Sequence, residues 1–497
     1  MRELLERFFS STITRLLALL VMIAALPLPF LQSFIAVRDP DIWWHIRVGD
    51  WILEHNAVPH VGIYSQHATM HAWTAYSWSL EVLMSWLYRG WGEAALPVWL
   101  ALVQGVLLFT LFMVLRRVAQ NFWVAWCLTA ATILAMAPIL SIRPLLFSIV
   151  FFIVEMGAIA KALRSESARP LYWLPLMYIV WANIHVQFVY GLAVLCLFAL
   201  CAVVTVAAGK LQWTWVPASS LPNDALKLAA VAAACAVAAC LGPYGAGLYK
   251  VVFGYAGNTA QYDQILELSS LSFRNPLHYV ELMIAMGAFF ALGWKRRWDP
   301  FRAGLLVVVT AVAFRSNRDV WYLVVVAAVW IAESLRDGMP GAAPDATPTR
   351  RYAMTFVVAM TLVFTVASSR QYLNKMALIN AIDAEFPLRA SNYIEDHKLQ
   401  GPMYNTLNWG GFLIRNLKQY PVSIDGRNDF YGAAFDTNAI ATVNGRAWTQ
   451  DPDLAKANFV VIERQLPLSY VLAENPDWSL VYHDELAAVF VRKVPVK

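Results

Sequence analysis

The chain has 497 residues, of which 59% are hydrophobic and only 14% are charged. A soluble domain usually carries about 25% charged residues, so this composition excludes an ordinary soluble enzyme and predicts an α-helical polytopic membrane protein. The net charge of +5 is modest, and because the basic residues lie mostly between apolar stretches, they predict orientation in a membrane and not binding to nucleic acid.

Apolar stretches that are long enough to cross a bilayer recur from the first span to residue 369. The sequence after the first stretch lacks a small-residue cleavage site, so we expect that stretch to be retained and not removed as a signal peptide. Hydropathy predicts about eleven spans. Their ranges are 13–36, 94–115, 121–140, 144–163, 171–184, 188–208, 226–242, 278–294, 301–314, 320–335 and 353–369.

The basic residues between these spans fall at alternate loops, as Arg116 and Lys161 illustrate. Because cytoplasmic loops are enriched in lysine and arginine, this alternation predicts a cytoplasmic amino terminus. Residues 37–93 and the chain from residue 370 then lie on the outer face. We therefore expect a multi-pass protein of the bacterial inner membrane with a periplasmic carboxy-terminal domain.

After residue 369 the composition becomes that of a soluble domain, which predicts a membrane domain at 1–369 and a periplasmic α/β domain at 370–497. A Pro/Gly-rich linker at 337–349 precedes the last span. In the outer domain Pro387 is expected to open a helix that runs to Leu399. Short strand-like runs predict strands at 403–404, 422–424 and 459–462, and a hairpin formed by 478–482 and 487–491.

The first outer loop, 37–93, carries Asp39, Asp41 and His45 among tryptophans at the edge of the membrane, and Glu81 on an amphipathic stretch. If a helix begins near residue 41, Asp41 and His45 share one of its faces. A carboxylate here could take a proton from an acceptor hydroxyl, or bind a Mg²⁺ or Mn²⁺ ion together with the histidine. The alternative is that Asp39 and Asp41 cap the helix, and that Glu81 lies on the water-facing side of its own amphipathic stretch.

The long outer loop at 243–277 contains a further acid, Glu267. Loops of this length often act as lids or binding loops. Glu267 is therefore another candidate catalytic acid, and plain solvation is the alternative.

Three arginines fall in short outer turns, at Arg143, Arg315 and Arg318, and His185 lies in another. Arginine is disfavoured on the outer side of a membrane, and its guanidinium binds phosphate with two parallel hydrogen bonds. These residues are candidates for binding the phosphate of a lipid. Pairing with Asp319 or with lipid head groups is the alternative.

In the outer domain, Trp409 precedes two consecutive glycines, Gly410 and Gly411, and a later turn reads Asp425-Gly-Arg427. Paired glycines let a backbone approach another group closely, and turns at strand ends often contact ligands. We take Trp409, Asp425 and Arg427 as candidate substrate-binding residues. A purely structural turn is the alternative.

Several short phrases together resemble the glycosyltransferase C superfamily and a group of bacterial multispan proteins of uncertain activity. They are Asp-x-Asp-Ile-Trp-Trp-His, Ile-Arg-Pro-Leu-Leu-Phe-Ser, Trp-Ala-Asn-Ile-His, Pro-Tyr-Gly, and Trp-Gly-Gly-Phe through Ile-Asp-Gly-Arg. Members of the superfamily transfer sugars from polyprenyl-phosphate or polyprenyl-diphosphate donors at the outer face. The resemblance implies Asp41, or Asp39, as base or metal ligand, and outer arginines that bind the lipid phosphate.

The stretch that begins at Asn408 is also distantly similar to the Trp-Trp-Asp-Tyr-Gly block of oligosaccharyltransferase catalytic subunits. In that block tryptophans and an aspartate recognise the acceptor sequon. Here Asn408 stands in place of the first tryptophan and Gly410 in place of the aspartate, so recognition of a sequon is not expected.

These observations favour a membrane glycosyltransferase that uses a polyprenyl-phosphate-linked donor and a glycan, lipid or protein acceptor. No nucleotide cofactor is expected, because the sequence has no Walker or dinucleotide-binding glycine motif. An O-antigen polymerase or ligase would use similar lipid-phosphate chemistry and is a rival hypothesis. A transporter of lipid-linked glycans and a non-enzymatic membrane scaffold are two further hypotheses, and neither requires catalysis.

Overall fold

The computed structural model describes residues 8–27, 34–210, 224–257, 268–294, 300–336, 347–369 and 373–494. The chain forms two compact units. The helical unit comprises Met1–Pro29, Leu100–Leu248 and Gln261–Ala367, and the mixed unit comprises Phe30–Trp99, Tyr249–Ala260 and Ser368–Lys497. The predicted boundary at 369 lies close to the last division. Residues 37–93, which the sequence assigns to the membrane domain as its first outer loop, belong to the same unit as the carboxy-terminal residues.

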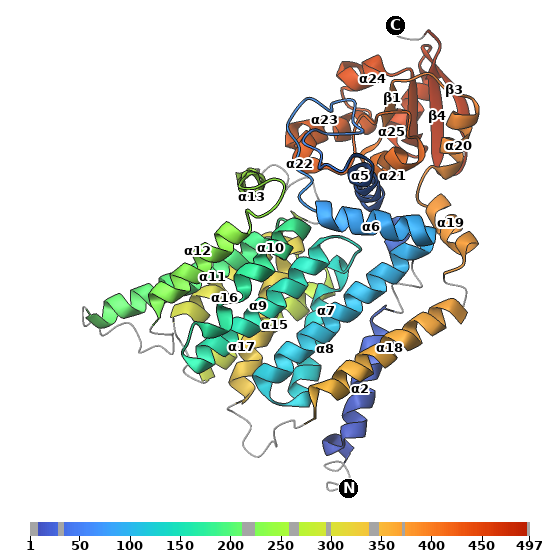
Figure 1. Ribbon diagram of the computed structural model, residues 1–497. Coiled ribbons are helices and arrows are strands. Elements are labelled where there is room, and N and C mark those ends of the chain that lie inside the picture. The colour runs from blue at the N-terminus through green and yellow to red at the C-terminus, as the bar shows by residue number, and fades with distance from the viewer. Residues whose placement is uncertain are drawn as a thin grey trace. The chain divides into compact units, whose positions relative to one another are not determined.

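The helical unit is built on α17, which is buried along most of its length and is packed against α8, α15 and α16 (Figure 1). Its main helices are α2 (Thr12–Ala25), α7 (Ala95–Ala119), α8 (Phe122–Met136), α9 (Leu145–Ser165), α10 (Leu174–Ile184), α11 (Phe188–Lys210), α12 (Ala225–Ala238), α15 (Pro276–Trp294), α16 (Pro300–Arg315), α17 (Val320–Arg336) and α18 (Thr349–Ser369). Short turns η2 (Ala137–Ile139), η3 (Arg169–Leu171) and η5 (Asn317–Asp319) connect some of them. Helix α13 (Gly247–Gly257) follows α12 along the chain and belongs mostly to the mixed unit.

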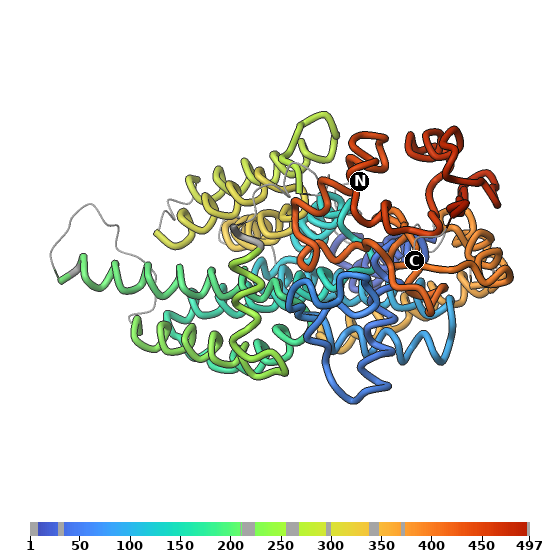
Figure 2. The backbone as a smooth tube through the Cα atoms, turned by 90° about the horizontal axis from the view of Figure 1, so that it is seen from above, coloured from blue at the N-terminus to red at the C-terminus, as the bar shows by residue number. Residues whose placement is uncertain are grey.

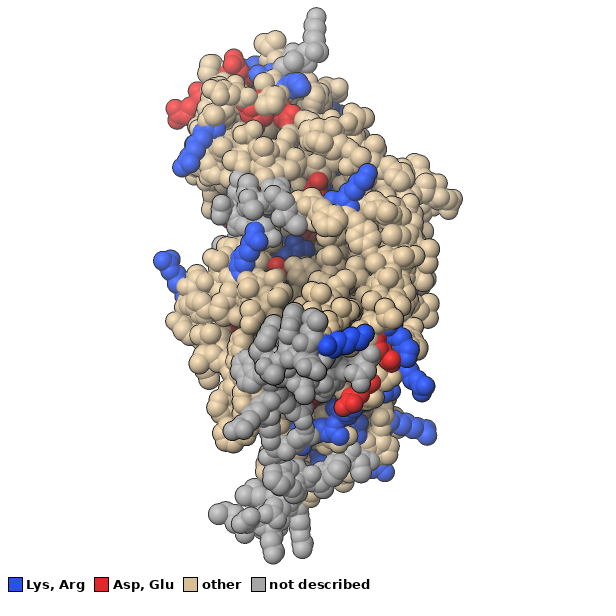
Figure 3. All heavy atoms as spheres, turned by 90° about the vertical axis from the view of Figure 1, so that its left-hand side faces the viewer, with Lys and Arg blue, Asp and Glu red and all other residues tan. Residues whose placement is uncertain are grey.

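Six helices in the described part of the chain are long and apolar enough to cross a membrane. They are Trp78–Ala119, Phe122–Ile139, Leu145–Ser165, Phe188–Ala208, Pro276–Trp294 and Thr349–Ser368. Large apolar side chains on other helix faces point outward, among them Leu226, Met283 and Phe290, and uncharged atoms cover most of the face in Figure 3. Such exposed apolar surface is expected where lipid replaces water. These features indicate a helical membrane protein, and the count of about eleven spans stays a prediction.

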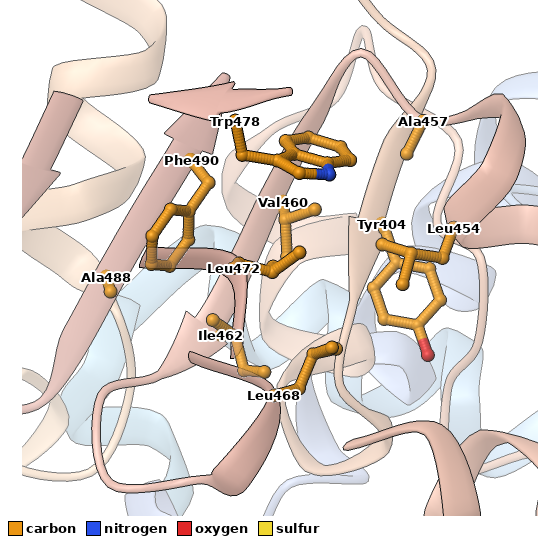
Figure 4. Packing of buried hydrophobic residues seen from close by; sticks show 10 residues of the cluster. All are labelled: Tyr404, Leu454, Ala457, Val460, Ile462, Leu468, Leu472, Trp478, Ala488 and Phe490. Carbon is orange, nitrogen blue, oxygen red and sulfur yellow. The ribbon is translucent and has the colours of Figure 1, made fainter. Parts of the chain in front are cut away.

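The mixed unit contains a four-stranded sheet of β1 (Met403–Asn405), β2 (Phe459–Glu463), β3 (Trp478–His483) and β4 (Ala487–Arg492). Their order is β1-β2-β4-β3, with β1 and β2 parallel and the other neighbours antiparallel. The strands at 403–404 and 459–462 and the hairpin are confirmed. One face of the sheet packs into a core drawn in Figure 4, which contains Tyr404, Leu454, Ala457, Val460, Ile462, Leu468, Leu472, Trp478, Ala488 and Phe490.

The helices of the mixed unit come from both ends of its sequence. From the first loop come α4 (Ile35–Arg38), α5 (Ile42–His55), α6 (Trp78–Trp91) and the turn η1 (Gly92–Ala94). From the carboxy-terminal part come α19 (Lys375–Asp383), α20 (Leu388–Asp396), α21 (Leu407–Asn416), α22 (Asn428–Tyr431), α23 (Ala433–Val443), η6 (Trp448–Gln450), α24 (Pro452–Lys456) and α25 (Pro467–Glu474). The helix expected after Pro387 is therefore α20. Helices α20 and α25 pack against strands β3 and β4.

The prediction of a strand at 422–424 is wrong, because this segment pairs with the first loop and not with the sheet. Val422 N–H donates to the carbonyl of Tyr64 at 2.9 Å, and Gln66 N–H donates to the carbonyl of Val422 at 2.9 Å. On the other side the Asn405 amide group donates to the carbonyl of Ile424 at 2.7 Å. A side chain and a distant loop thus satisfy the backbone groups that a strand neighbour would otherwise satisfy.

Candidate functional site

The candidate site is centred on α5 and α6, which pack against each other within the mixed unit. The helix expected from residue 41 is confirmed as α5, and ten of its fourteen residues are buried. A Cβ atom on Gly49 would lie only 2.0 Å from the carbonyl oxygen of Glu81. Glycine at this position therefore lets the two helix backbones touch, and this contact fixes the acid of α6 beside the histidine of α5.

Asp39 and Asp41 lie just before α5, in the order that the sequence suggested. Asp39 Oδ1 accepts the backbone N–H of Asp41 at 3.0 Å, and Asp41 Oδ1 accepts the indole N–H of Trp44 at 3.2 Å. Asp41 occupies the N-cap position, yet its side chain makes no cap hydrogen bond. Asp39 is buried and Asp41 is half-buried. Helix capping therefore does not account for the side chain of Asp41.

His45 and Glu81 form a buried pair at the centre of the site. His45 Nδ1 lies 2.9 Å from Glu81 Oε1, and the ring of Trp44 lies against the imidazole with centroids 3.6 Å apart. Glu81 is 1% exposed, and its other oxygen, Oε2, has no hydrogen-bond partner. A buried carboxylate oxygen without a partner is energetically costly, so Glu81 stays a candidate for the catalytic acid that the sequence suggested.

Asp50, on the next turns of α5, is a charged residue that the sequence patterns did not single out. Its Oδ1 accepts from the Ser85 hydroxyl at 2.7 Å and from Arg89 Nε at 2.8 Å. Burial acts to raise the pKa of Asp50, but these hydrogen bonds and the Arg89 charge outweigh it and hold the pKa below its usual range. Asp50 is thus a fixed anion that ties α5 to α6.

Asp41 and His45 are the two residues expected to bind a divalent metal ion. Asp41 and His45 lie on consecutive turns of the chain, where the His45 N–H donates to the carbonyl of Asp41 at 3.2 Å. Among the residues that the structure describes, no group of three or more His, Cys, Asp or Glu side chains converges as a metal site would require. Binding of Mg²⁺ or Mn²⁺ by Asp41 and His45 stays a prediction.

The two glycine motifs of the carboxy-terminal part close around the start of α5. A Cβ on Gly411 would lie 2.5 Å from the carbonyl oxygen of Pro40, and one on Gly426 would lie 2.0 Å from Asp41 Oδ1. Figure 2 shows the blue first-loop segment against the orange and red carboxy-terminal segment. The expectation that the paired glycines permit a close approach is confirmed: Gly411 approaches Pro40, next to Asp41, and Gly410 approaches the carbonyl of Ile424.

Asp425 and Arg427, expected to contact substrate, form an ion pair with each other in the interior of the mixed unit. Arg427 Nε and Nη2 donate to the two carboxylate oxygens of Asp425 at 2.7 and 2.6 Å, and both side chains are fully buried. The guanidinium carbon lies 4.7 Å from the ring centre of Trp73 in the first loop. The hydroxyl of Tyr431 also donates to Asp425, at 2.9 Å. These contacts stabilise the fold, and contact with substrate stays a prediction.

Trp409 lies close to these motifs and is buried as well. Its indole N–H donates to the carbonyl of Glu385 at 3.2 Å, which ties α21 to the end of α19. A role of this tryptophan in binding substrate stays a prediction.

The remaining predicted phosphate-binding residues belong to the helical unit. His185 ends α10, is 2% exposed, and its Nδ1 lies 2.8 Å from the hydroxyl of Ser148. Arg143 lies half-buried in the turn before α9, where its carbonyl accepts from the N–H of Leu146. His185 is thus held inside the helix packing, whereas Arg143 keeps part of its surface accessible.

Arg315 and Arg318 flank the turn between α16 and α17. Arg315 is exposed at the end of α16, and Arg318 is half-buried in η5 beside Asp319. Asp319 Oδ1 accepts the hydroxyl of Tyr190 at 2.8 Å. The turn therefore carries two arginines three positions apart, and their binding of phosphate stays a prediction. Glu267, the last predicted acid, lies outside the described residues.

The helical unit contains a buried acid that the sequence patterns above do not include. The hydroxyl of Tyr178 donates to Glu155 Oε2 at 2.9 Å, while Glu155 Oε1 is buried without a hydrogen-bond partner. Glu155 is fully buried. It is the only acid in the predicted span 144–163, and an ionisable residue within a span is a functional candidate by default. That signal was available in the sequence.

Comparison with known proteins gives no relative: no family model matches the chain, and no curated protein matches it.

Proposed function

We propose that this protein is a membrane glycosyltransferase that transfers a sugar from a polyprenyl-phosphate-linked donor to an acceptor hydroxyl. The observation that carries the proposal is the half-buried Asp41. Its side chain makes no cap hydrogen bond, and it lies one helical turn from His45, which is paired with the incompletely satisfied Glu81. A carboxylate held beside a buried histidine–glutamate pair is the kind of group that proton transfer requires.

In the proposed reaction the hydroxyl oxygen of the acceptor attacks the anomeric carbon of the sugar. Asp41 accepts the proton of that hydroxyl at the same time. The bond between that carbon and the phosphate oxygen breaks, and the lipid phosphate leaves with the electron pair. The indole N–H of Trp44 donates to Oδ1 of Asp41 and so orients this carboxylate. The Glu81–His45 pair fixes the helix face on which Asp41 lies.

Separately, we propose that arginines of the helical unit, among them Arg315 and Arg318, bind the phosphate of a polyprenyl-linked lipid. Guanidinium groups stabilise the charge that develops on a leaving phosphate. The bilayer in which the donor dissolves would surround the six apolar helices. On this proposal the protein resides in the bacterial inner membrane with the mixed unit on the periplasmic side.

The test is a sugar-transfer assay with full-length protein in lipid vesicles and a polyprenyl-phosphate-linked sugar. Asp41→Asn should lower the rate by about 100-fold or more, the contribution expected of a general base. Glu54→Gln is the matched control, because Glu54 is an exposed acid on the same helix that pairs with Arg89. Wild-type transfer by the Asp41→Asn protein would refute the proposal.

A non-enzymatic scaffold is the second candidate, and one observation favours it. Asp425, Arg427 and Gly426, which belong to the motifs that resemble an enzyme family, all serve to hold the mixed unit together. If the protein is a scaffold, cells that express the Asp41→Asn variant should grow as wild type does. Cells that express a protein without residues 370–497 should not. For the enzyme, both changes should have the same effect.

A further inference from the structure

A pocket of about 760 Å³ opens between α7 and α9 in the helical unit, remote in sequence from the acids of the candidate site. We call it the α7–α9 pocket. Its lining includes three cations, Arg117, Lys161 and Arg164, and the described residues that line it include no acid. Nothing in the proposed transfer reaction uses these three cations.

The cations lie at one end of the pocket, where both helices finish. Arg117 is the third residue from the end of α7, and Lys161 and Arg164 lie in the last turns of α9. Arg164 Nη2 donates to the carbonyl of Val118 at 3.2 Å, so its side chain joins the two helix ends. Arg117 and Lys161 are exposed. A ligand could therefore reach both charges without disturbing the fold.

The rest of the pocket is apolar. Phe109, Met113 and Val114 of α7 face Val154 and Ala158 of α9 across it. Phe109 and Val154 each precede a cation of their helix by seven or eight residues, which at about 1.5 Å per residue corresponds to roughly 10–12 Å along the helix. The pocket thus combines a charged end with an apolar part, and that apolar part is long enough to hold the first carbons of a lipid acyl chain.

Gly157 keeps the two helices close at this level. A Cβ on Gly157 would lie 3.1 Å from Val114 Cγ1, closer than most side-chain contacts. At this level the side chain of Val114 therefore packs directly on the glycine backbone of α9. Both helices meet the length and hydropathy of a membrane span, so their charged ends are expected at the membrane surface.

We propose that the α7–α9 pocket binds an anionic phospholipid of the surrounding bilayer. Arg117 and Lys161 would contact the phosphate, and the first carbons of a chain would lie against Val114 and Val154. Basic residues at the ends of spans also set orientation, but that role needs no apolar channel beneath them. Basic pockets between membrane helices are a known way of binding anionic head groups. This inference does not depend on the proposed sugar transfer.

The experiment measures binding of phosphatidylglycerol and phosphatidylcholine to the full-length protein by mass spectrometry of the intact protein–lipid complexes. Wild-type protein should bind phosphatidylglycerol at least 10-fold more tightly than phosphatidylcholine. R117Q/K161Q should remove that preference. The matched control is Lys227→Gln, which deletes an exposed cation of the same unit that pairs with Asp224 outside the pocket, and it should keep the preference.

A second variant, Val154→Trp, keeps the cations and fills the apolar channel. This variant should bind phosphatidylglycerol more weakly than wild type does, although its cations are intact. Thermal unfolding in detergent confirms that each variant is folded. Equal affinity for the two lipids, or an unchanged preference in R117Q/K161Q, would overturn the proposal. Inorganic phosphate that binds wild type as tightly as phosphatidylglycerol does would also overturn it, because the occupant would then be free phosphate and not a lipid.

Discussion

Gly426 and Asp41 lie at opposite ends of the mixed unit's sequence, yet a Cβ on Gly426 would fall 2.0 Å from Asp41 Oδ1. The turn that follows Asp425 is thus pressed against the start of α5, and glycine is the residue that such a contact permits. The same contact fixes one oxygen of the proposed catalytic carboxylate. Fold and candidate site are therefore coupled through a single close approach.

Substitution of Gly426 by alanine should destabilise the protein and displace Asp41. The added methyl group has no room, and overpacking of this kind costs about 1–3 kcal/mol. We expect a lower midpoint of thermal unfolding for the full-length protein in detergent, together with reduced sugar transfer. Gly90→Ala is the control, because a Cβ there meets nothing within 4 Å; it should leave the midpoint unchanged or slightly raised. Equal midpoints in the two variants would contradict the contact.

Removal of one partner of the buried ion pair between Asp425 and Arg427 should lower the free energy of unfolding more than removal of both partners. Arg427→Met leaves the Asp425 carboxylate buried without its partner, which typically costs about 3–5 kcal/mol. Asp425→Asn combined with Arg427→Met removes both charges and should recover part of that loss. Chemical unfolding of the three proteins measures the difference. A double variant less stable than Arg427→Met alone would show that the charge is not the source of the cost.

Asp436 should make the mixed unit less stable as the pH rises. Burial, with the charges of Asp425 and Asp429, raises the pKa of Asp436 to about 7, whereas an aspartate in an unfolded chain has a pKa near 3.9. The folded state therefore holds this proton more tightly. Its stabilising contribution is complete below about pH 4 and is lost as the pH rises through about 7.

Asp436→Asn should remove that dependence. The variant should be more stable than wild type at pH 8, by up to about 4 kcal/mol on the scale of roughly 1.4 kcal/mol per pKa unit, and the gap should narrow toward pH 4. Thermal unfolding between pH 4 and 8 measures it. Asp396→Asn changes an exposed aspartate of the same unit and should give a curve parallel to wild type. A constant difference between Asp436→Asn and wild type would contradict the assignment.

The local elements of the mixed unit could be predicted from the sequence because local signals define them. Short continuous runs of apolar residues around Val460 and Val489 specify β2 and β4, which pair with each other. The segment at Val422 has the same apolar character, but its backbone hydrogen bonds go to Tyr64 and Gln66. No local pattern encodes a partner more than 350 residues away, so the predicted strand at that segment is wrong.

In the candidate site, too, the sequence indicated the residue types but not their partners in the fold. The residue types at Asp41, His45 and Glu81 indicated proton-transfer chemistry, and the structure brings His45 and Glu81 within 2.9 Å. The sequence could not show that Asp425 and Arg427 neutralise each other in the interior, because a charge in a turn looks the same whether its partner is a ligand or a neighbouring side chain. Pairing of that kind depends on packing and not on spacing.

Gly191 provides a test within the helical unit. A Cβ there would lie 2.3 Å from Glu155 Oε2 and 2.6 Å from the hydroxyl of Tyr178, so Gly191→Ala should separate the two groups and leave a buried carboxylate with one partner fewer. Loss of a hydrogen bond to such a group costs about 1–3 kcal/mol. We expect a lower unfolding midpoint for this variant in detergent.

The control for Gly191→Ala is Gly304→Ala on α16, where a Cβ meets nothing within 4 Å, and it should not lower the midpoint. Tyr178→Phe removes the same hydrogen bond without adding volume. If hydrogen bonding to Glu155 is the source of the effect, Gly191→Ala should add little destabilisation to a Tyr178→Phe protein, since neighbouring changes that remove one interaction are not additive. Full additivity would show that Gly191 acts through helix packing alone.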